Sequence, residues 1–282
     1  MEFSVREPSP DLNTIVKQYM IVTSLKDYEK LLFLPNVGNF IIFNQGIESC
    51  IYKYDSNEVV SHIPRDFSVS PKGKDVVKLG IDESHLEDTI KFPILVVELL
   101  PTGYNRLFSK NAFDLRTKHI SLNNCIDDKS ISFDALYTID GLDRKITYIE
   151  EQLVKLKEAA TPVQNVFLVI EEIIQYIIDT MQKVNVSDIL DKFSYSRSSL
   201  ERDFKKIVGY TPKEFILITR FCVIFKDLTL NGYDYMKQDH DFFDQSHMNK
   251  AFKKFIDISP SKLQGYINDN DIQIYQLNRD YA

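Results

Sequence analysis

The feature that most constrains the fold is an internal repeat in the C-terminal part of the chain. Phe204-Lys205-Lys206 recurs as Phe252-Lys253-Lys254, and Thr211-Pro212-Lys213-Glu214-Phe215 recurs as Ser259-Pro260-Ser261-Lys262-Leu263, both at an offset of 48 residues. Repetition at one fixed offset indicates that the same structural unit is present twice. We therefore expect two similar units in this part of the chain.

Each unit has the pattern of two short helices joined by a tight turn. In the first unit, the inward face of the first helix carries Val186, Ile189, Leu190 and Phe193, with an N-cap such as Ser187. A turn through Ser194-Tyr195 leads to Ser196, a predicted cap for a second helix whose inward residues are Leu200, Phe204 and Ile207. Gly209 ends that helix, and Pro212 starts a long apolar helix to about Leu228.

The outward face of this second helix is polar and basic, and its candidate DNA contacts are Arg197, Ser198, Glu201, Arg202 and Lys205. Helix, tight turn and polar helix together are typical of a helix-turn-helix whose second helix enters the major groove of DNA. Arginine and lysine suit guanine, asparagine suits adenine, and glutamate accepts a hydrogen bond from cytosine. Binding to double-stranded DNA is therefore the predicted activity.

The second unit repeats the plan 48 residues later. The inner side of its first helix comes from Tyr233, Met236, His240 and Phe242, Asp244 is the predicted cap, and Met248, Phe252 and Phe255 face inward. Its outward residues, also candidate DNA contacts, are Gln245, Ser246, Asn249, Lys250 and Lys253. At the shared offset, Glu201-Arg202 corresponds to Asn249-Lys250, so both units place base-contacting residue types at one helical position.

The N-terminal part has a different pattern. Short apolar runs rich in β-branched and aromatic residues, separated by turn formers, extend from about residue 19 to 100. From about residue 141 the spacing of Ile146, Ile149, Leu153 and Leu156 predicts an amphipathic helix, and a second helix follows through Ile170 and Ile177. The expected fold class is α+β, with a β-rich, barrel-like N-terminal domain, flanking helices and an all-α C-terminal domain.

These patterns divide the chain into four segments. We expect a β-rich sensing domain at 1–140, a helical linker at 141–182, a tandem helix-turn-helix domain at 183–267 and a polar tail at 268–282. The linker helices suit subunit contact, or they simply pack on the adjoining core.

The net charge of −7 is unevenly divided along the chain. Residues 183–267 carry 14 Lys and Arg against 11 Asp and Glu, whereas residues 1–182 carry 19 Lys and Arg against 27 Asp and Glu. An acidic half joined to a mildly basic half is compatible with DNA binding.

The C-terminal sequence resembles the AraC/XylS family of bacterial transcription regulators. The residues that carry the resemblance run from Tyr195-Ser196-Arg197 to Gly209-Tyr210-Thr211-Pro212, and from Asp244-Gln245-Ser246 to Ile258-Ser259-Pro260. The resemblance implies a seven-helix domain in which the long helix holds both helix-turn-helix units on one DNA face. The chain departs from the family at small-residue positions, which here hold Leu190 and Ser194, then Lys237 and Asp241.

Further partners follow from the same resemblance. The N-terminal part is similar to the β-rich sensor domains of some AraC-type regulators, which implies a small-molecule effector, a homodimer and contact with RNA polymerase. The alternative hypothesis is an interaction module whose helix-turn-helix domain no longer recognises DNA. Activation or repression, the effector and the operator are not specified by the sequence.

Several other classes of protein are not expected. The five histidines and three cysteines lack metal-ligand spacing, and the sequence shows neither a nucleophile elbow nor a glycine-rich phosphate loop, so we expect no metal, no cofactor and no enzyme activity. The cysteines are odd in number and scattered along the chain, which favours reduced thiols over disulfides. The first residues lack the pattern of a secretory signal, and no apolar run is long enough for a membrane span, so a cytoplasmic location is expected.

Overall fold

The fold is described from a computed structural model of residues 1–282. The described residues are 2–24, 31–33, 35, 37–44, 49–53, 58–63, 67–70, 77–81, 93–115, 119–161, 165–180, 184–239, 252, 255, 259–268 and 273–275.

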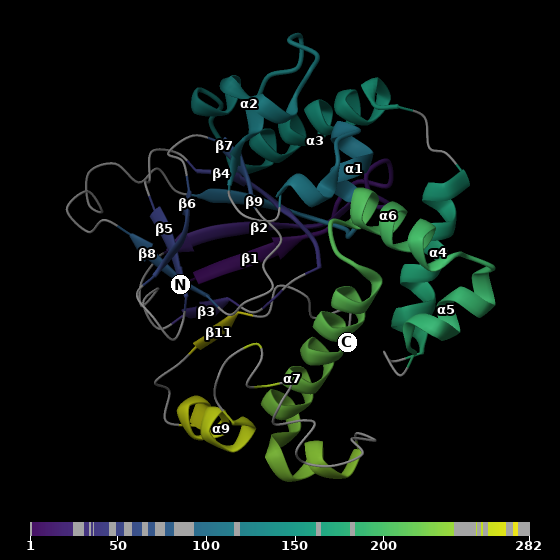
Figure 1. The fold of residues 1–282 in the computed structure, drawn as a ribbon. Coiled ribbons are helices and arrows are strands. Elements are labelled where there is room, and N and C mark those ends of the chain that lie inside the picture. Colours follow the sequence, from purple (N-terminus) through teal and green to yellow (C-terminus); the bar gives the residue numbers. More distant parts are fainter. Residues whose placement is uncertain are drawn as a thin grey trace.

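Two β-sheets form the N-terminal part of the molecule (Figure 1). The six-stranded sheet has the order β1 (Glu2–Arg6), β2 (Val16–Ser24), β9 (Ile94–Leu99), β4 (Phe40–Phe43), β7 (Phe67–Val69) and β10 (Ile120–Ser121). The five-stranded sheet has the order β11 (Gln273–Tyr275), β3 (Leu31–Phe33), β8 (Val77–Ile81), β5 (Ser49–Lys53) and β6 (Val59–Ile63). The apolar runs predicted as strands are thus strands in the structure.

Strand β11 comes from the C-terminal tail and pairs in parallel with β3, in a register that sets Gln273 opposite Leu31. Every other strand pair among the described residues is antiparallel. The last described strand of the chain therefore joins a sheet of the N-terminal part.

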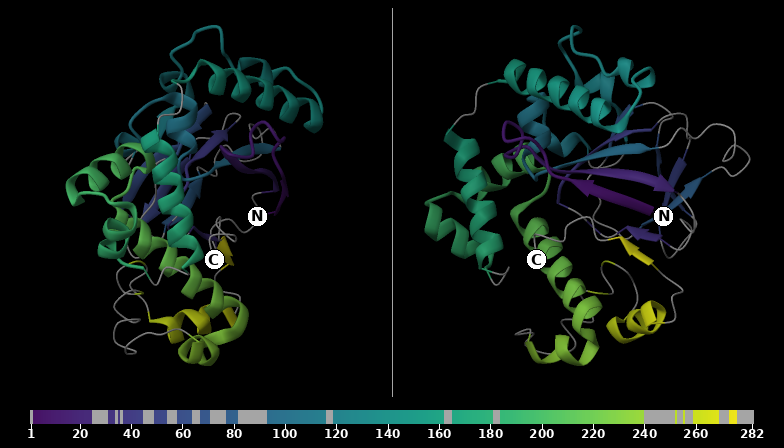
Figure 2. Two further views of the ribbon diagram at one scale, coloured as in Figure 1. Left: turned by 90° about the vertical axis from the view of Figure 1, so that its right-hand side faces the viewer. Right: turned by 180° about the vertical axis from the view of Figure 1, so that it is seen from behind.

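Helices cover the six-stranded sheet and close the first hydrophobic core. They are α1 (Gly103–Phe108), α2 (Leu122–Cys125) and α3 (Leu142–Ala159), with the 3-10 helices η3 (Ala112–Leu115) and η4 (Asp134–Tyr137). In α3 the residues Ile146, Ile149, Leu153 and Leu156 are at most 5% exposed and pack into this core, as their spacing predicted. Figure 2 shows α3 lying across the top of the sheet. The core carries the stabilisation that comes from removing apolar side chains from water.

A second hydrophobic core lies among the C-terminal helices. These are α4 (Asn165–Asp179), α5 (Val186–Phe193), α6 (Arg197–Val208), α7 (Pro212–Asp239) and α9 (Pro260–Asn268). Helix α7 consists of two helices joined by a kink at Gly232, which has a non-helical φ of 82°. The first of them ends close to the expected position near Leu228. The α+β fold class, with β-sheets first and helices after them, is confirmed.

The helices α3 and α4 pack into different cores. The apolar face of α3 belongs to the N-terminal core, whereas Phe167, Ile170, Ile173, Ile174 and Ile177 of α4 belong to the core of the C-terminal helices. Val37 also reaches this second core, and the thiol of Cys222 on α7 donates a hydrogen bond to the carbonyl oxygen of Pro35 at 3.4 Å. The two halves of the chain are thus in direct contact.

All three cysteines are free in the structure. Burial raises the pKa of Cys222 to about 12 and raises the pKa of Cys125, so both thiols stay protonated near neutral pH. Among the described residues, no helix combines the length and apolar character that a membrane span needs.

Candidate DNA interface

Helix α5 begins with a capping box. The side chain of Asn185 accepts hydrogen bonds from the backbone N–H groups of Ser187 and Asp188, and the carboxylate of Asp188 accepts one from the backbone N–H of Asn185 at 2.8 Å. Three otherwise unpaired backbone donors are satisfied in this way. The sequence-based assignment of Ser187 as the cap was wrong, because the helix starts at Val186 and Asn185 precedes it.

The turn between α5 and α6 depends on a serine in the left-handed conformation. Ser194 has φ 53° and ψ 39°, and its backbone N–H bonds to the carbonyl of Leu190. Glycine is the residue most suited to this region, since a side chain there meets the following carbonyl oxygen. Ser194 thus adopts the left-handed turn geometry without being a glycine.

Helix α6 is capped at both ends and anchored on one face. Ser196 accepts a hydrogen bond from the backbone N–H of Ser199 at 3.2 Å, and Gly209 closes the helix at φ 83°. Both caps were predicted. The inward residues Leu200, Phe204 and Ile207 are at most 4% exposed, and the Phe204 ring packs edge-on against Phe215 of α7. This anchoring fixes which side chains of α6 face outward.

The outward face of α6 divides into an exposed part and a covered part. Arg197, Ser198 and Arg202 are exposed, whereas Glu201 and Lys205 are half-buried. The side chain of Arg202 is 72% exposed, and its guanidinium forms two hydrogen bonds with the carboxylate of Asp203, Nε to Oδ1 at 2.9 Å and Nη2 to Oδ2 at 3.3 Å. This pairing raises the pKa of Arg202. The sequence pattern gave no indication of it.

Lys205 contacts the N-terminal part of the molecule. Its Nζ lies 5.7 Å from the centre of the Phe113 ring, and α6 packs against η3, α1 and α4. Figure 1 shows α6 at the junction of the two halves of the chain. Hydrophobic periodicity does not indicate contacts between residues so far apart in sequence, so the sequence did not predict this one.

Helix α7 follows a second capping box. The backbone N–H and the hydroxyl of Thr211 both donate to the Glu214 carboxylate, and the backbone N–H of Glu214 donates to the Thr211 hydroxyl. Pro212 occupies the first helical position, as predicted, where no backbone donor is needed.

Most of the second predicted unit lies outside the described residues. This applies to the proposed contacts Gln245, Ser246, Asn249, Lys250 and Lys253 and to Asp244, Met248, His240 and Phe242. Phe252 and Phe255, predicted to face inward, are 0% and 8% exposed. Both rings pack against Phe221 of α7, Phe252 edge-on with ring centres 5.3 Å apart and Phe255 at a tilt with ring centres 4.7 Å apart. The long helix therefore contacts the inward residues of both units.

The imidazole of His119 is buried beside Ser61. The Ser61 hydroxyl accepts a hydrogen bond from the backbone N–H of His119 at 3.1 Å and lies 2.9 Å from the imidazole Nδ1. Burial lowers the pKa of His119 to about 4, so the ring is neutral at pH 7. Within the described residues, no three His, Cys, Asp or Glu side chains come close enough together to hold a metal ion.

Comparisons with known proteins identify the C-terminal fold. Residues 189–265 match the family model of a helix-turn-helix domain. Eight solved chains are similar in structure. An apo ToxT variant from Vibrio cholerae is 14% identical, with a TM-score of 0.44, over 88% of this chain and 97% of that chain.

Two further solved structures are similar. ToxT from Vibrio cholerae with a bound unsaturated fatty acid is 13% identical, with a TM-score of 0.41, over 93% of this chain and 94% of that chain. The AraC-like transcriptional activator CuxR is 14% identical, with a TM-score of 0.26, over 83% and 90%. No curated protein sequence matches the chain. Residues 189–265 thus contain a helix-turn-helix domain, as the repeat and its caps predicted.

Proposed function

We propose that the chain is a sequence-specific, DNA-binding transcription regulator in which α6 enters the major groove. The observation that carries the proposal is the exposed face of α6, where Arg197, Ser198 and Arg202 point to solvent from a helix anchored on its opposite side. A helix held by buried residues and capped at both ends presents its outward side chains in a fixed geometry, which base recognition requires. The match to the helix-turn-helix model over 189–265 supports the same conclusion.

Asp203 is proposed to orient Arg202 toward DNA. The guanidinium group has five N–H donors, and the two hydrogen bonds to Asp203 engage only Nε and Nη2. The Nη1 donors and the second hydrogen on Nη2 remain available for a guanine edge, which needs two donors. A preoriented arginine loses less side-chain entropy on binding than a free one.

The complete set of proposed contacts comes from both units. In the first unit they are Arg197, Ser198, Glu201, Arg202 and Lys205, and in the second they are Gln245, Ser246, Asn249, Lys250 and Lys253. We propose that the second set contacts a neighbouring segment of the groove, because the two units share one long helix. Their equal spacing from the repeated Phe-Lys-Lys segments supports this assignment.

The N-terminal part is proposed to control DNA binding through a small-molecule effector or through dimerisation. The sensing segment is 1–140, the tandem helix-turn-helix segment is 183–267 and the tail is 268–282. The packing of α3 and α4 into different cores supports a junction between them, within the 141–182 segment. A homodimer and contact with RNA polymerase stay predictions from the family resemblance.

The test is the selection of genomic DNA fragments by the purified full-length protein, followed by anisotropy titration of the best fragment over a range of salt concentrations. The proposal predicts enrichment of fragments with two sites about one helical turn apart and an affinity that falls steeply with salt, because phosphate contacts release counterions. Enrichment of one site alone would restrict base contacts to the first unit. No enrichment at low salt, for the full chain or for 183–282, would contradict the proposal and favour the interaction-module hypothesis.

A further inference from the structure

Cys50 and His62 form a thiol–imidazole pair on the five-stranded sheet. The two residues lie directly opposite each other on β5 and β6, and the Cys50 Sγ is 3.1 Å from the Nδ1 of the His62 ring. In the tautomer that leaves Nδ1 without a hydrogen, this nitrogen accepts a hydrogen bond from the thiol. The proposed DNA-binding function makes no use of either side chain.

The pair lies on the outer face of the sheet. Side chains alternate between the two faces along a strand, and on β6 the side chain of His62 is exposed while its neighbours Ser61 and Ile63 are buried. Cys50 is half-buried, whereas the other two cysteines of the chain are buried. Cys50 is therefore the cysteine that a dissolved reagent reaches most readily.

An aromatic ring lies on the other side of the thiol. Cys50 is paired with Gly80 of β8, and a Cβ atom at Gly80 would collide with the ring of Tyr52. Tyr52 follows Cys50 by two residues on the same strand, so their side chains leave the strand on the same face. The thiol is thus flanked by an imidazole on β6 and by an aromatic ring over β8, which limits the directions from which a reagent approaches it.

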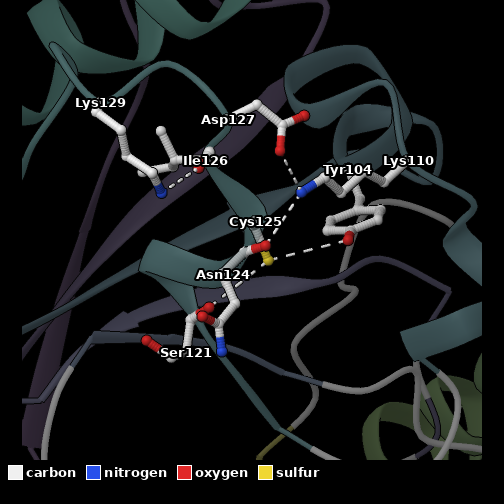
Figure 3. A network of polar contacts seen from close by, with 8 residues as sticks. All are labelled: Tyr104, Lys110, Ser121, Asn124, Cys125, Ile126, Asp127 and Lys129. Carbon is white, nitrogen blue, oxygen red and sulfur yellow. Dashed lines mark hydrogen bonds and ion pairs between the residues drawn. The ribbon is translucent and has the colours of Figure 1, made fainter.

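The surroundings of the other two thiols differ. In Figure 3 the Cys125 thiol lies between the hydroxyl of Tyr104, which donates to Sγ at 3.9 Å, and the carbonyl oxygen of Ser121, which accepts from Sγ at 3.8 Å. The Cys222 thiol donates to the carbonyl oxygen of Pro35. A carbonyl oxygen is not a base for a thiol, and burial raises the pKa of both thiols. Because the thiolate is the nucleophile, we expect both buried cysteines to react slowly.

A thiol next to a base is a nucleophile toward hydroperoxides. The proton of the Cys50 thiol passes to Nδ1 of His62, and the sulfur attacks the terminal oxygen of the hydroperoxide. The S–O bond forms as the O–O bond breaks, and the imidazolium gives its proton to the leaving hydroxide or alkoxide, which departs as water or an alcohol. The thiol is oxidised to a sulfenic acid and the peroxide is reduced.

We propose that Cys50 is a modification site that hydroperoxides oxidise to a sulfenic acid, with His62 as the base. Figure 1 shows β5 and β6 on the side of the molecule away from α6, so the modified residue lies apart from the proposed DNA contacts. The reaction needs no DNA and can be measured on the full-length protein alone.

The experiment treats the full-length protein with hydrogen peroxide, traps sulfenic acid with dimedone and measures by mass spectrometry how fast each cysteine is labelled. The wild type is compared with His62→Ala, which removes the base at an exposed position. The matched control is His119→Asn, which removes the imidazole that contacts Ser61 on the buried face of β6. Thermal melting of each protein checks that the chain is folded, and the His62→Ala reaction is repeated with free imidazole in solution.

In the wild type and in His119→Asn, Cys50 should be labelled at least roughly tenfold faster than Cys125 and Cys222. His62→Ala should slow the labelling of Cys50 roughly 10-fold to 100-fold, which lies at or below the lower end of what a positioned base contributes. Free imidazole should restore part of this rate, because it replaces the missing base.

Two results would overturn the proposal. Labelling of Cys50 that is no faster than that of the buried cysteines would contradict the modification site. An equal rate in the wild type and His62→Ala, or a slower rate that free imidazole does not restore, would contradict the role of His62 as the base. Either result would leave the proposed DNA-binding function standing, since no DNA takes part in the measurement.

Discussion

Arg202 and Asp203 are neighbours on α6 whose side chains form a bidentate pair, with Nε–Oδ1 and Nη2–Oδ2 distances of 2.9 Å and 3.3 Å; the Arg202 side chain is exposed and the Asp203 side chain is largely buried beside it. Planar pairing of this kind restricts the guanidinium to one orientation. The negative charge of Asp203 also opposes indiscriminate attraction of this face to phosphates.

The pair yields a prediction for Asp203→Asn. Binding to the selected site should weaken, because Arg202 loses its orienting partner, while binding to random duplex should strengthen, because the negative charge beside Arg202 is removed. Anisotropy titrations on both DNAs measure the ratio of the two affinities. An unchanged ratio would show that Asp203 does not orient Arg202.

A second prediction concerns the left-handed turn between α5 and α6. Replacement of Ser194, at φ 53°, by glycine should raise the free energy of unfolding by about 0.5–1 kcal/mol, since the strain relieved exceeds the added chain entropy of the unfolded state. Urea denaturation measures the change. DNA affinity should stay the same.

Ser109 provides a matched comparison for this turn. It has φ 52°, but its hydroxyl accepts a hydrogen bond from the backbone N–H of Thr161 at 2.8 Å, which Ser109→Gly would lose. We expect the gain at Ser109 to be smaller than at Ser194 or to be reversed. Equal stabilisation by the two substitutions would mean that the hydroxyl contact contributes nothing.

The Arg106–Glu171 ion pair should contribute to stability more than an exposed pair does. Its side chains are 15% and 30% exposed, so Arg106→Met should lower the free energy of unfolding by about 1–3 kcal/mol by leaving Glu171 without its cation. The Arg6–Asp143 pair, with side chains 43% and 85% exposed, is the control, and Arg6→Met should cost about 0–1 kcal/mol. Similar losses of unfolding free energy for Arg106→Met and Arg6→Met, measured by urea denaturation, would show that the buried pair contributes no more than the exposed one.

The burial of His119 predicts that the free energy of unfolding decreases at acidic pH. Its pKa is lowered by burial to about 4 in the folded protein and is about 6.5 in an unfolded chain, so the unfolded state binds a proton first as the pH falls. This contribution destabilises the fold progressively between pH 6.5 and pH 4 and is absent above pH 6.5. His119→Asn should reduce the loss of stability across that interval in urea denaturation, and an identical pH profile would contradict the assignment.

Much of the C-terminal half could be predicted from the sequence because its helix ends and buried faces depend on residues close together in the chain. Ser196, Gly209 and Pro212 mark helix ends through backbone hydrogen bonding within a few residues, and the spacing of Leu200 and Phe204 specifies the buried face. The cap of α5 was misassigned by two residues, since Asn185 and Ser187 are both good capping types.

Contacts between distant segments could not be predicted in this way. The pairing of β11 with β3 joins a polar tail to a strand about 240 residues earlier, and the register depends on backbone groups that every sequence has. The Lys205–Phe113 contact likewise depends on how the two hydrophobic cores are placed against each other. Hydrophobic periodicity shows which face of an element is buried and does not show which partner covers it.

The most direct test of the central claim compares Arg202→Ala with Arg144→Ala, an exposed arginine on α3, using the selected DNA site and random duplex of equal length. Base recognition by α6 predicts that Arg202→Ala weakens binding to the selected site roughly 10-fold to 100-fold and binding to random duplex far less, while Arg144→Ala changes neither. An equal loss on both DNAs, or no loss on either, would contradict base recognition by α6.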